Sequence, residues 1–400
     1  MDIWNRLMEL PHRKKLLVLL LLATLLLSLF ITVDRLYVDT AVNTDPSTDH
    51  TDNQLYIQRA QTILDGRLLY RDVDTQTPPL INYLLVPPVA LGGSPLAFEI
   101  YFSMFIVITA LSIYHFLSPI DDRKAFAGAV MFLLIPSTLV IPSFARQDEA
   151  IVVLFFLLPL LAMVVSRRRW LYAAGAALGV WIKMHSIFLI PPLLVKERRH
   201  ALRHIMVMAA VSLAATLPFL MLAYDEFMFH LRFYLLGQGD EPLQGISLWR
   251  ILDSQGMGVP KIGLIALMGI AFLAVYVMAY HKNLGVWKTV GLTLLLYFIL
   301  YPKIHYEYYL VLFGLLAPYV IVSRRMLAGL FGISLLSGAT LLIEQRYLDW
   351  GTTTAHSGLF IALAAACMLA IDVILVVLFR YMATRETWLD REPLVNQPLS

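Results

Sequence analysis

The chain has 400 residues, of which 59% are hydrophobic and only 15% are charged, and its formal net charge is +3. This composition excludes an ordinary soluble domain and indicates an integral membrane protein. The small net charge gives no reason to expect a nucleic-acid partner. A single cysteine, Cys367, excludes a disulfide framework and a metal cluster built from cysteines.

Apolar runs close to the length needed to cross about 30 Å of hydrocarbon recur along the chain, without the alternating period of barrel strands. We therefore predict an all-α integral membrane protein with about 12 transmembrane helices. The predicted spans are residues 16–33, 97–117, 125–144, 151–166, 170–182, 187–195, 205–222, 262–280, 290–301, 309–322, 326–343 and 359–379.

Lysine and arginine gather in the short segments at one end of these runs, which hold about 20 of the 31 basic residues. By the positive-inside rule we predict a multi-pass protein of the cell (plasma) membrane, with cytoplasmic N- and C-termini. Two long loops, 34–96 and 223–261, then lie on the extracytoplasmic face. We treat residues 1–385 as one membrane domain and 386–400 as a cytoplasmic tail.

The first long loop begins with an acidic segment that leads into a predicted helix. A capping-box pattern starts at Thr51, and Asp65 with Gly66 marks the end of the helix. Apolar residues recur at helical spacing between them and predict an amphipathic helix on the membrane surface: Tyr56, Ala60, Ile63 and Leu64. Asp52 falls in its first turn and Asp49 just before it. Two interpretations stay open: these carboxylates only stabilise the helix N-terminus, or they serve chemistry.

The residues that follow carry a resemblance to a known family. The pattern D-x3-Y-x3-A-x5-G-x3-Y, followed by a Pro-Pro-Leu turn at 78–80, is met by Asp52, Tyr56, Ala60, Gly66 and Tyr70. This arrangement resembles the first outer loop of the GT-C superfamily of membrane glycosyltransferases, which take sugar from a polyprenyl-phosphate carrier. It is similar both to the protein O-mannosyltransferase and aminoarabinose transferase branch and to the GPI and polyprenol-dependent mannosyltransferases.

Three later places also resemble this superfamily. Asp148 and Glu149 follow the third predicted span, where such enzymes often carry a second acidic site. The stretch 175–192 resembles their helix–Lys–helix element, and 301–309 resembles their late outer motif with His and Tyr. Two positions depart from the pattern: Asn53 stands where the first branch commonly has a second acidic residue, and His50 occupies the first acidic position of the mannosyltransferase DxD motif.

The apolar segments on either side of Lys183 are each too short to cross a membrane. We therefore predict a break in the helix at 183–186, near the outer surface, because a lysine at bilayer depth costs about 2.5–3.5 kcal/mol. A functional lysine at such a break is well placed to bind a phosphate. His185, two residues later, is a candidate to assist it.

The resemblance implies roles for the polar residues named above and for several others. Asp52, supported by Asp49, is the candidate general base that takes a proton from the acceptor hydroxyl in an inverting transfer. The donor phosphate would be bound by Lys183, His185, Arg146 and Arg71. The sugar or the acceptor would be bound by Asp148, Glu149, His305, Tyr306 and Tyr308. A divalent cation, Mg²⁺ or Mn²⁺, is an open question, with Asp49, Asp52 and Asp148 as candidate ligands.

The implied partners are a lipid-linked sugar donor, a glycan, lipid or protein acceptor, and the membrane itself. A secondary transporter is the alternative, in which Asp148, Lys183 and His305 would bind ions or substrate. A non-catalytic scaffold is a further alternative, although it leaves the acidic first loop unexplained. The enzyme interpretation predicts that Asp52 and these three residues converge on one outward-facing site.

Overall fold

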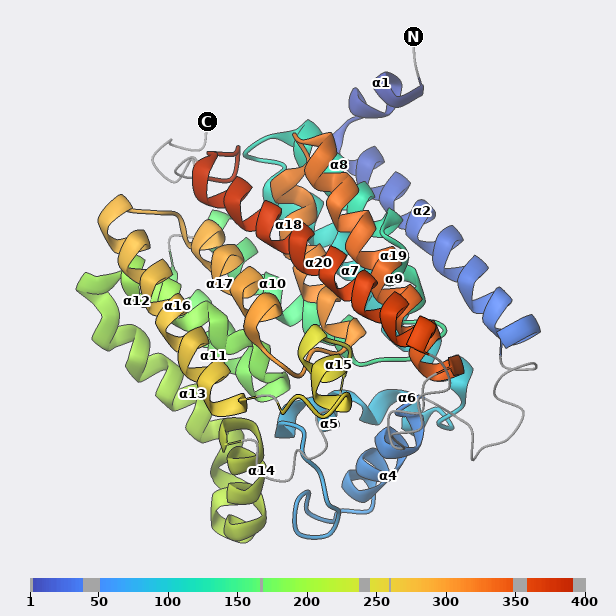
Figure 1. Ribbon diagram of the computed structural model, residues 1–400, viewed down its shortest axis with the longest axis vertical. Helices are drawn as coiled ribbons and strands as arrows, with labels where there is room; N and C mark the ends of the chain where they lie inside the picture. The colour runs from blue at the N-terminus through green and yellow to red at the C-terminus, as the bar shows by residue number, and fades with distance from the viewer. Residues whose placement is uncertain are drawn as a thin grey trace.

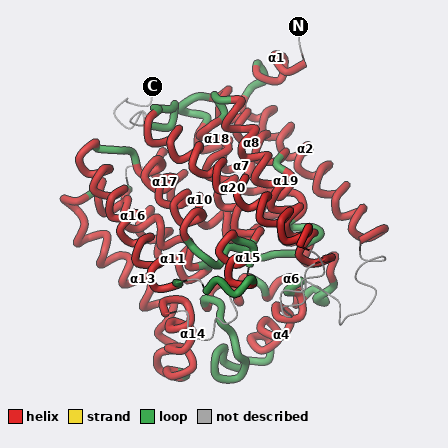
Figure 2. The backbone as a smooth tube through the Cα atoms, in the orientation of Figure 1, coloured by secondary structure: helices red, strands yellow, loops and turns green. Residues whose placement is uncertain are grey.

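The computed structural model describes residues 3–38, 51–165, 168–236, 245–258, 260–347 and 358–390. Helices joined by loops make up these ranges, and no strand occurs within them (Figure 2). The prediction of an all-α chain is therefore confirmed for the part of the protein that the structure describes. The residues of the acidic segment up to His50, including Asp49, lie outside the described ranges.

Among the described residues, six helices are long and apolar enough to cross a membrane. Their bounds are α2 (His12–Val33), α7 (Pro95–Leu117), α13 (Ala201–Leu222), α16 (Lys261–Lys282), α19 (Arg324–Tyr347) and α20 (Gly358–Thr384). A short π-helix, η1 (Asp34–Val38), continues α2. These apolar helices identify the chain as a helical multi-pass membrane protein.

The remaining predicted spans correspond to shorter helices. They are α8 (Asp122–Leu134), α9 (Pro136–Val140), α10 (Glu149–Val165), α11 (Arg169–Ile182), α12 (Ile190–Lys196), α17 (Val286–Leu300) and α18 (Tyr309–Val320). The total of twelve spans therefore stays a prediction. The run 125–144 was expected to be continuous and is not: Ile135 is extended and Pro136 starts α9, because a residue before proline disfavours the helical conformation.

The helices form a bundle with two distinct ends (Figure 1). One end holds α1 (Ile3–Met8) and the end of α20, and Lys15 in the first turn of α2 pairs there with Asp122 at the start of α8. The opposite end, which we call the loop end, carries the short helices of the two long loops. These are α4 (Asn53–Leu64), α5 (Pro79–Leu84), α6 (Val86–Ala90), α14 (Tyr224–Leu236) and α15 (Leu248–Ser254).

The centre of the bundle is formed by α10 and α18, which pack against each other, and every residue of α18 is buried. Close packing there depends on glycine: a Cβ added to Gly314 would lie 2.6 Å from a methyl carbon of Val153. Small residues at such contacts are typical of helix pairs in membranes, because dispersion rather than the hydrophobic effect holds them together. The buried starts of α10 and α18 bring their preceding loops into the interior.

Candidate functional site

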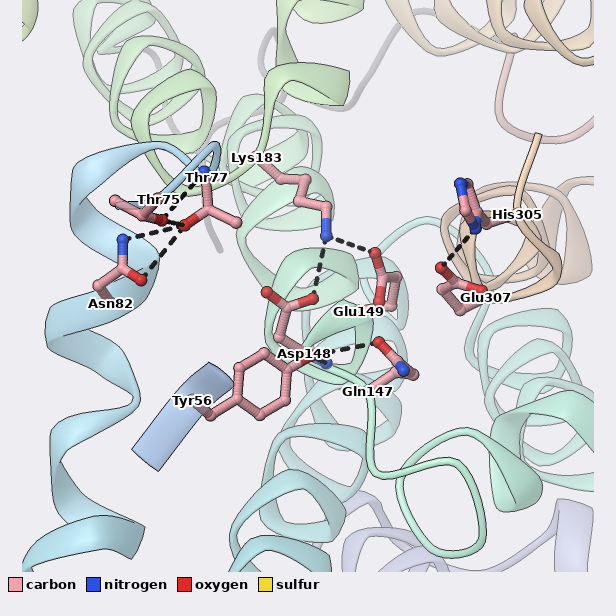
Figure 3. A network of polar contacts seen from close by, with 10 residues as sticks. All are labelled: Tyr56, Thr75, Thr77, Asn82, Gln147, Asp148, Glu149, Lys183, His305 and Glu307. Carbon is pink, nitrogen blue, oxygen red and sulfur yellow. Dashed lines mark hydrogen bonds and ion pairs between the residues drawn. The ribbon is translucent and has the colours of Figure 1, made fainter. Parts of the chain in front are cut away.

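Polar side chains from segments far apart in the sequence point toward one another, among them Lys183, Asp148 and Glu149 (Figure 3). Four separate segments contribute these side chains: the start of α4, the start of α10, the turn after α11 and the segment before α18. We call this set the polar cluster, and its members are Asp52, Tyr56, Gln147, Asp148, Glu149, Lys183, His185, His305, Glu307 and Tyr308.

Lys183 is the central cation of the polar cluster. Its Nζ lies 3.0 Å from Oδ1 of Asp148 and 2.7 Å from Oε1 of Glu149, and its side chain is 14% exposed. The carboxylates are still more deeply buried, at 3% and 0% exposure. Buried charges persist in proteins when they are paired in this way. The two acidic residues and the lysine therefore form one unit.

The break predicted around Lys183 is confirmed. Helix α11 ends at Ile182, Lys183 is extended, and a 3₁₀ helix, η3 (Met184–Leu189), follows before α12. The turn lies very close to α11, since a Cβ added to Gly179 would be 2.5 Å from Oγ of Ser186. Glycine at this position lets the chain fold back, and the extended backbone directs Lys183 toward α10.

Asp52 joins the polar cluster from the first long loop. It is the N-cap residue of α4, so the helix starts one residue later than a cap at Thr51 would give, and its side chain makes no capping hydrogen bond. The carboxylate instead accepts a hydrogen bond from the side chain of Gln147. Burial, followed by the nearby charge of Asp148, raises the pKa of Asp52 above its ordinary value. Helix capping alone therefore does not explain this carboxylate.

Tyr56 connects α4 to the start of α10. Its hydroxyl donates to Oε1 of Gln147 at 3.2 Å and accepts from the backbone N–H of Asp148 at 3.3 Å. Its ring packs against Phe98 and Phe102 of α7, with centroid separations of 5.9 and 6.1 Å. The tyrosine of the first-loop motif thus positions the acidic residues rather than pointing to solvent.

The segment before α18 contributes His305 and Glu307. Nδ1 of His305 lies 3.7 Å from Oε1 of Glu307. Burial raises the pKa of Glu307 to about 8, and burial, with Lys303 and Lys183 nearby, lowers the pKa of His305 to about 3. Both groups are therefore neutral at pH 7, and their contact is not an ion pair.

Aromatic rings close the cluster beside Lys183. The rings of His185 and Tyr308 meet edge to face with centroids 4.5 Å apart, and Nε2 of His185 is 3.4 Å from the hydroxyl of Tyr297. The ammonium group of Lys183 lies 5.7 Å from the centroid of the Tyr308 ring, within cation–π range. His185 therefore has partners in the aromatic wall, and its Nδ1 is buried without a hydrogen bond.

Asp52, Asp148, Lys183 and His305 all belong to the polar cluster, as expected from the sequence; that they surround an outward-facing cavity stays a prediction. Three other candidates lie elsewhere. Arg146 pairs with Glu99 of α7 at 3.7 Å, in a separate buried group that also includes Arg35 and Asp34. Arg71 is exposed and pairs with Asp72, beside a surface cavity of about 580 Å³. Tyr306 is half-buried and packs against the main hydrophobic core.

Several buried polar residues in or near the site were not singled out from the sequence. Gln147 and Glu307 are members of the polar cluster. Each is a direct sequence neighbour of a candidate site residue, and this adjacency could have identified them. Arg59 is buried on α4, three residues after Tyr56. Glu99 is fully buried in the first turns of α7. Arg59 and Glu99 could have been identified from the sequence because each is a charged residue on an otherwise apolar helix face.

The predicted divalent-cation site remains untested, because one of its candidate ligands, Asp49, lies outside the described residues. Within the described part of the chain, no group of three or more His, Cys, Asp or Glu residues is arranged to hold a metal ion. The described carboxylates Asp148 and Glu149 have the ammonium group of Lys183 between them instead.

No protein-family model and no curated protein matches this chain.

Proposed function

We propose that the protein is an inverting membrane glycosyltransferase. In this proposal it moves a sugar, a hexose such as mannose, from a polyprenyl-phosphate donor to a hydroxyl of a glycan, lipid or protein on the extracytoplasmic face of the cell membrane. The observation that supports it is the meeting of Asp52, from the first long loop, with Asp148 and Lys183 in one buried cluster. A general base and a phosphate-binding cation are the two groups that such a transfer requires.

Asp52 acts as the general base in this mechanism. Its carboxylate takes the proton of the acceptor hydroxyl as the acceptor oxygen bonds to the anomeric carbon of the sugar. The bond between that carbon and the phosphate oxygen breaks, and the polyprenyl phosphate leaves with the electron pair. Burial and Asp148 raise the pKa of Asp52, and a carboxylate with a raised pKa is a stronger base near neutral pH.

Lys183 stabilises the negative charge that develops on the leaving phosphate. Its position is fixed by the two carboxylates, which hold Nζ at 3.0 and 2.7 Å. Such preorganisation avoids a reorganisation cost during the reaction. The uncharged His305 and Glu307 supply hydrogen-bonding groups for sugar or acceptor hydroxyls without adding charge.

The test uses the purified full-length protein and a panel of labelled polyprenyl-phosphate sugars. The wild type should consume at least one donor, and Asp52→Asn should lower turnover by about 10²- to 10⁴-fold, the usual contribution of a general base. Asp72→Asn is the matched control, because Asp72 is an aspartate of the same loop that pairs with exposed Arg71. Near wild-type turnover of the Asp52→Asn variant would contradict the proposal.

A secondary transporter is the second candidate, favoured by one observation. A buried lysine bound to two carboxylates, beside a protonated Glu307, is also the kind of group that couples ion movement to transport. Proteoliposomes distinguish the two functions. Substrate flux without cleavage of the donor supports transport, whereas cleavage at unchanged permeability supports transfer.

A further inference from the structure

Arg59 of α4 is a buried cation that forms no ion pair with the described residues. Its side chain is 9% exposed, and its Nε is buried without a hydrogen bond. None of the ion pairs among the described residues includes it. Burying an unpaired guanidinium is costly, so such a group is expected to meet an anion in the working state of the protein.

The position of Arg59 on α4 directs it toward the polar cluster. It follows Tyr56 by three residues and Asp52 by seven, which places all three on neighbouring positions of one helix face. Helical side chains lean toward the N-terminus, so the long side chain of Arg59 extends back toward the turn that carries Asp52. Burial and Asp148 raise the pKa of Asp52, while the positive charge of Arg59 opposes this shift, as expected for a nearby cation.

Asn53 gives a second, independent indication of a ligand on this helix. Its side chain is 3% exposed, and its Oδ1 is buried without a hydrogen-bond partner. An amide oxygen accepts a hydrogen bond from a hydroxyl group, while a guanidinium donates to an anionic oxygen. A ligand that carries both a phosphate and hydroxyl groups would satisfy the two residues together.

The charge balance of the polar cluster also calls for a second cation. Lys183 already contacts the carboxylates of Asp148 and Glu149, and the carboxylate of Asp52 lies close to them. A phosphate that approached Lys183 alone would therefore meet strong repulsion from the acidic side chains. The guanidinium of Arg59, whose positive charge acts on Asp52, reduces this repulsion.

We propose that Arg59 binds the phosphate of the lipid-linked donor, on the α4 side of Asp52. This inference rests on the proposed glycosyl transfer and assigns the recognition of its donor. The planar guanidinium presents two parallel N–H groups to two phosphate oxygens, a geometry that lysine does not reproduce.

Binding of a sugar-free polyprenyl phosphate tests the assignment without any need for turnover. The purified full-length protein, in detergent, is titrated with polyprenyl phosphate, with the corresponding polyprenol, and with phosphatidylglycerol. Arg59→Gln should weaken polyprenyl-phosphate binding about 10- to 100-fold, the usual effect of losing a hydrogen-bonded charge. Polyprenol binding should stay unchanged, and Arg59→Lys should recover only part of the affinity.

Arg67→Gln is the matched control, because Arg67 follows α4 on the surface, where it and its partner Asp65 are both exposed. This variant should bind like the wild type. Unchanged polyprenyl-phosphate affinity in Arg59→Gln would overturn the inference, as would an equal loss for the polyprenol. If the wild type binds phosphatidylglycerol as tightly as polyprenyl phosphate, and Arg59→Gln loses both, Arg59 binds lipid head groups in general and the inference is overturned. If Arg59→Gln does not fold, wild-type affinity in Arg59→Lys overturns the assignment of a bidentate contact.

The inference and the proposed function fail in different ways. If Asp52→Asn abolishes sugar transfer while Arg59→Gln leaves donor binding unchanged, only the role of Arg59 is wrong. If polyprenyl phosphate binds through Arg59 but the wild type transfers sugar from no donor in the panel, the binding site stands and the proposed transfer is wrong.

Discussion

The hydroxyl of Tyr56 lies 3.3 Å from the backbone nitrogen of Asp148, a residue 92 positions later in the chain. The same hydroxyl donates to the side chain of Gln147 at 3.2 Å. One phenol group therefore connects the surface helix of the first long loop to the first residues of a central helix. This connection fixes the distance between Asp52, at the start of α4, and the ion pairs of Lys183.

Removing this hydroxyl should weaken both the fold and the proposed activity. Tyr56→Phe leaves the backbone N–H of Asp148 and the side chain of Gln147 buried without their shared partner. We expect a loss of about 1–3 kcal/mol in the free energy of unfolding, and lower turnover because Asp52 is held less firmly. Thermal unfolding in detergent and the donor-consumption assay measure the two effects.

Tyr83→Phe serves as the matched control, because Tyr83 is a tyrosine of the same loop with 46% of its surface exposed. It should behave like the wild type in both assays. If Tyr56→Phe also keeps wild-type stability and turnover, the hydrogen bonds of Tyr56 do not position the site.

Glu307 should make the stability of the protein fall as the pH rises. Its pKa is about 8 in the folded protein and 4.5 ordinarily, so between these values the unfolded chain releases a proton that the folded chain keeps. The free energy of unfolding therefore decreases across this range, by at most about 1.4 kcal/mol per pH unit, and levels off above it. His305, with a folded pKa of about 3 and an ordinary value of 6.5, has the opposite effect below pH 6.5.

The effects of the two residues can be separated between pH 6.5 and 8. In this range the protonation of Glu307 still differs between the folded and unfolded states, whereas that of His305 no longer does. Glu307→Gln should make the melting temperature fall less steeply with pH in this interval than it does in the wild type. Glu226→Gln, at an exposed glutamate of α14, should keep the wild-type slope. Parallel slopes for wild type and Glu307→Gln would show that Glu307 is not protonated in the folded state.

Gly179 should be essential for the position of Lys183. A methyl group at this position would lie 2.5 Å from Oγ and 2.8 Å from Cβ of Ser186, so Gly179→Ala should push η3 away from α11. We expect Lys183 to lose its contacts with Asp148 and Glu149, and overpacking of this kind costs about 1–3 kcal/mol. Thermal unfolding and donor binding report the two consequences.

Gly269→Ala is the control, since Gly269 lies in the helix α16 with nothing within 4 Å of an added methyl group. It should be neutral or stabilising, because alanine is the better helix former. The double variant Gly179→Ala with Ser186→Gly removes both close contacts and should recover the loss. No recovery would mean that the effect of Gly179→Ala arises elsewhere.

Some local features of the site were predictable from neighbouring residues alone. The break at Lys183 followed from the shortness of the apolar segments on either side, and the end of α4 followed from Asp65 and Gly66, whose φ is +70°. The continuous span expected at 125–144 was wrong, because Pro136 interrupts the helix. The cap at Thr51 was also wrong by one residue, because Asp52 turns toward Gln147 once α4 packs against the bundle.

The sequence by itself determined the class of the protein, because apolar runs, helix caps and basic loops act locally and are read from a few neighbouring residues. Only the tertiary structure decided which charges meet. Arg146 pairs with Glu99 and Lys183 with Asp148 and Glu149, and Arg59 is left beside Asp52. These choices depend on the packing of helices far apart in the chain, and pairing energies inside the bundle depend on burial that no single segment specifies.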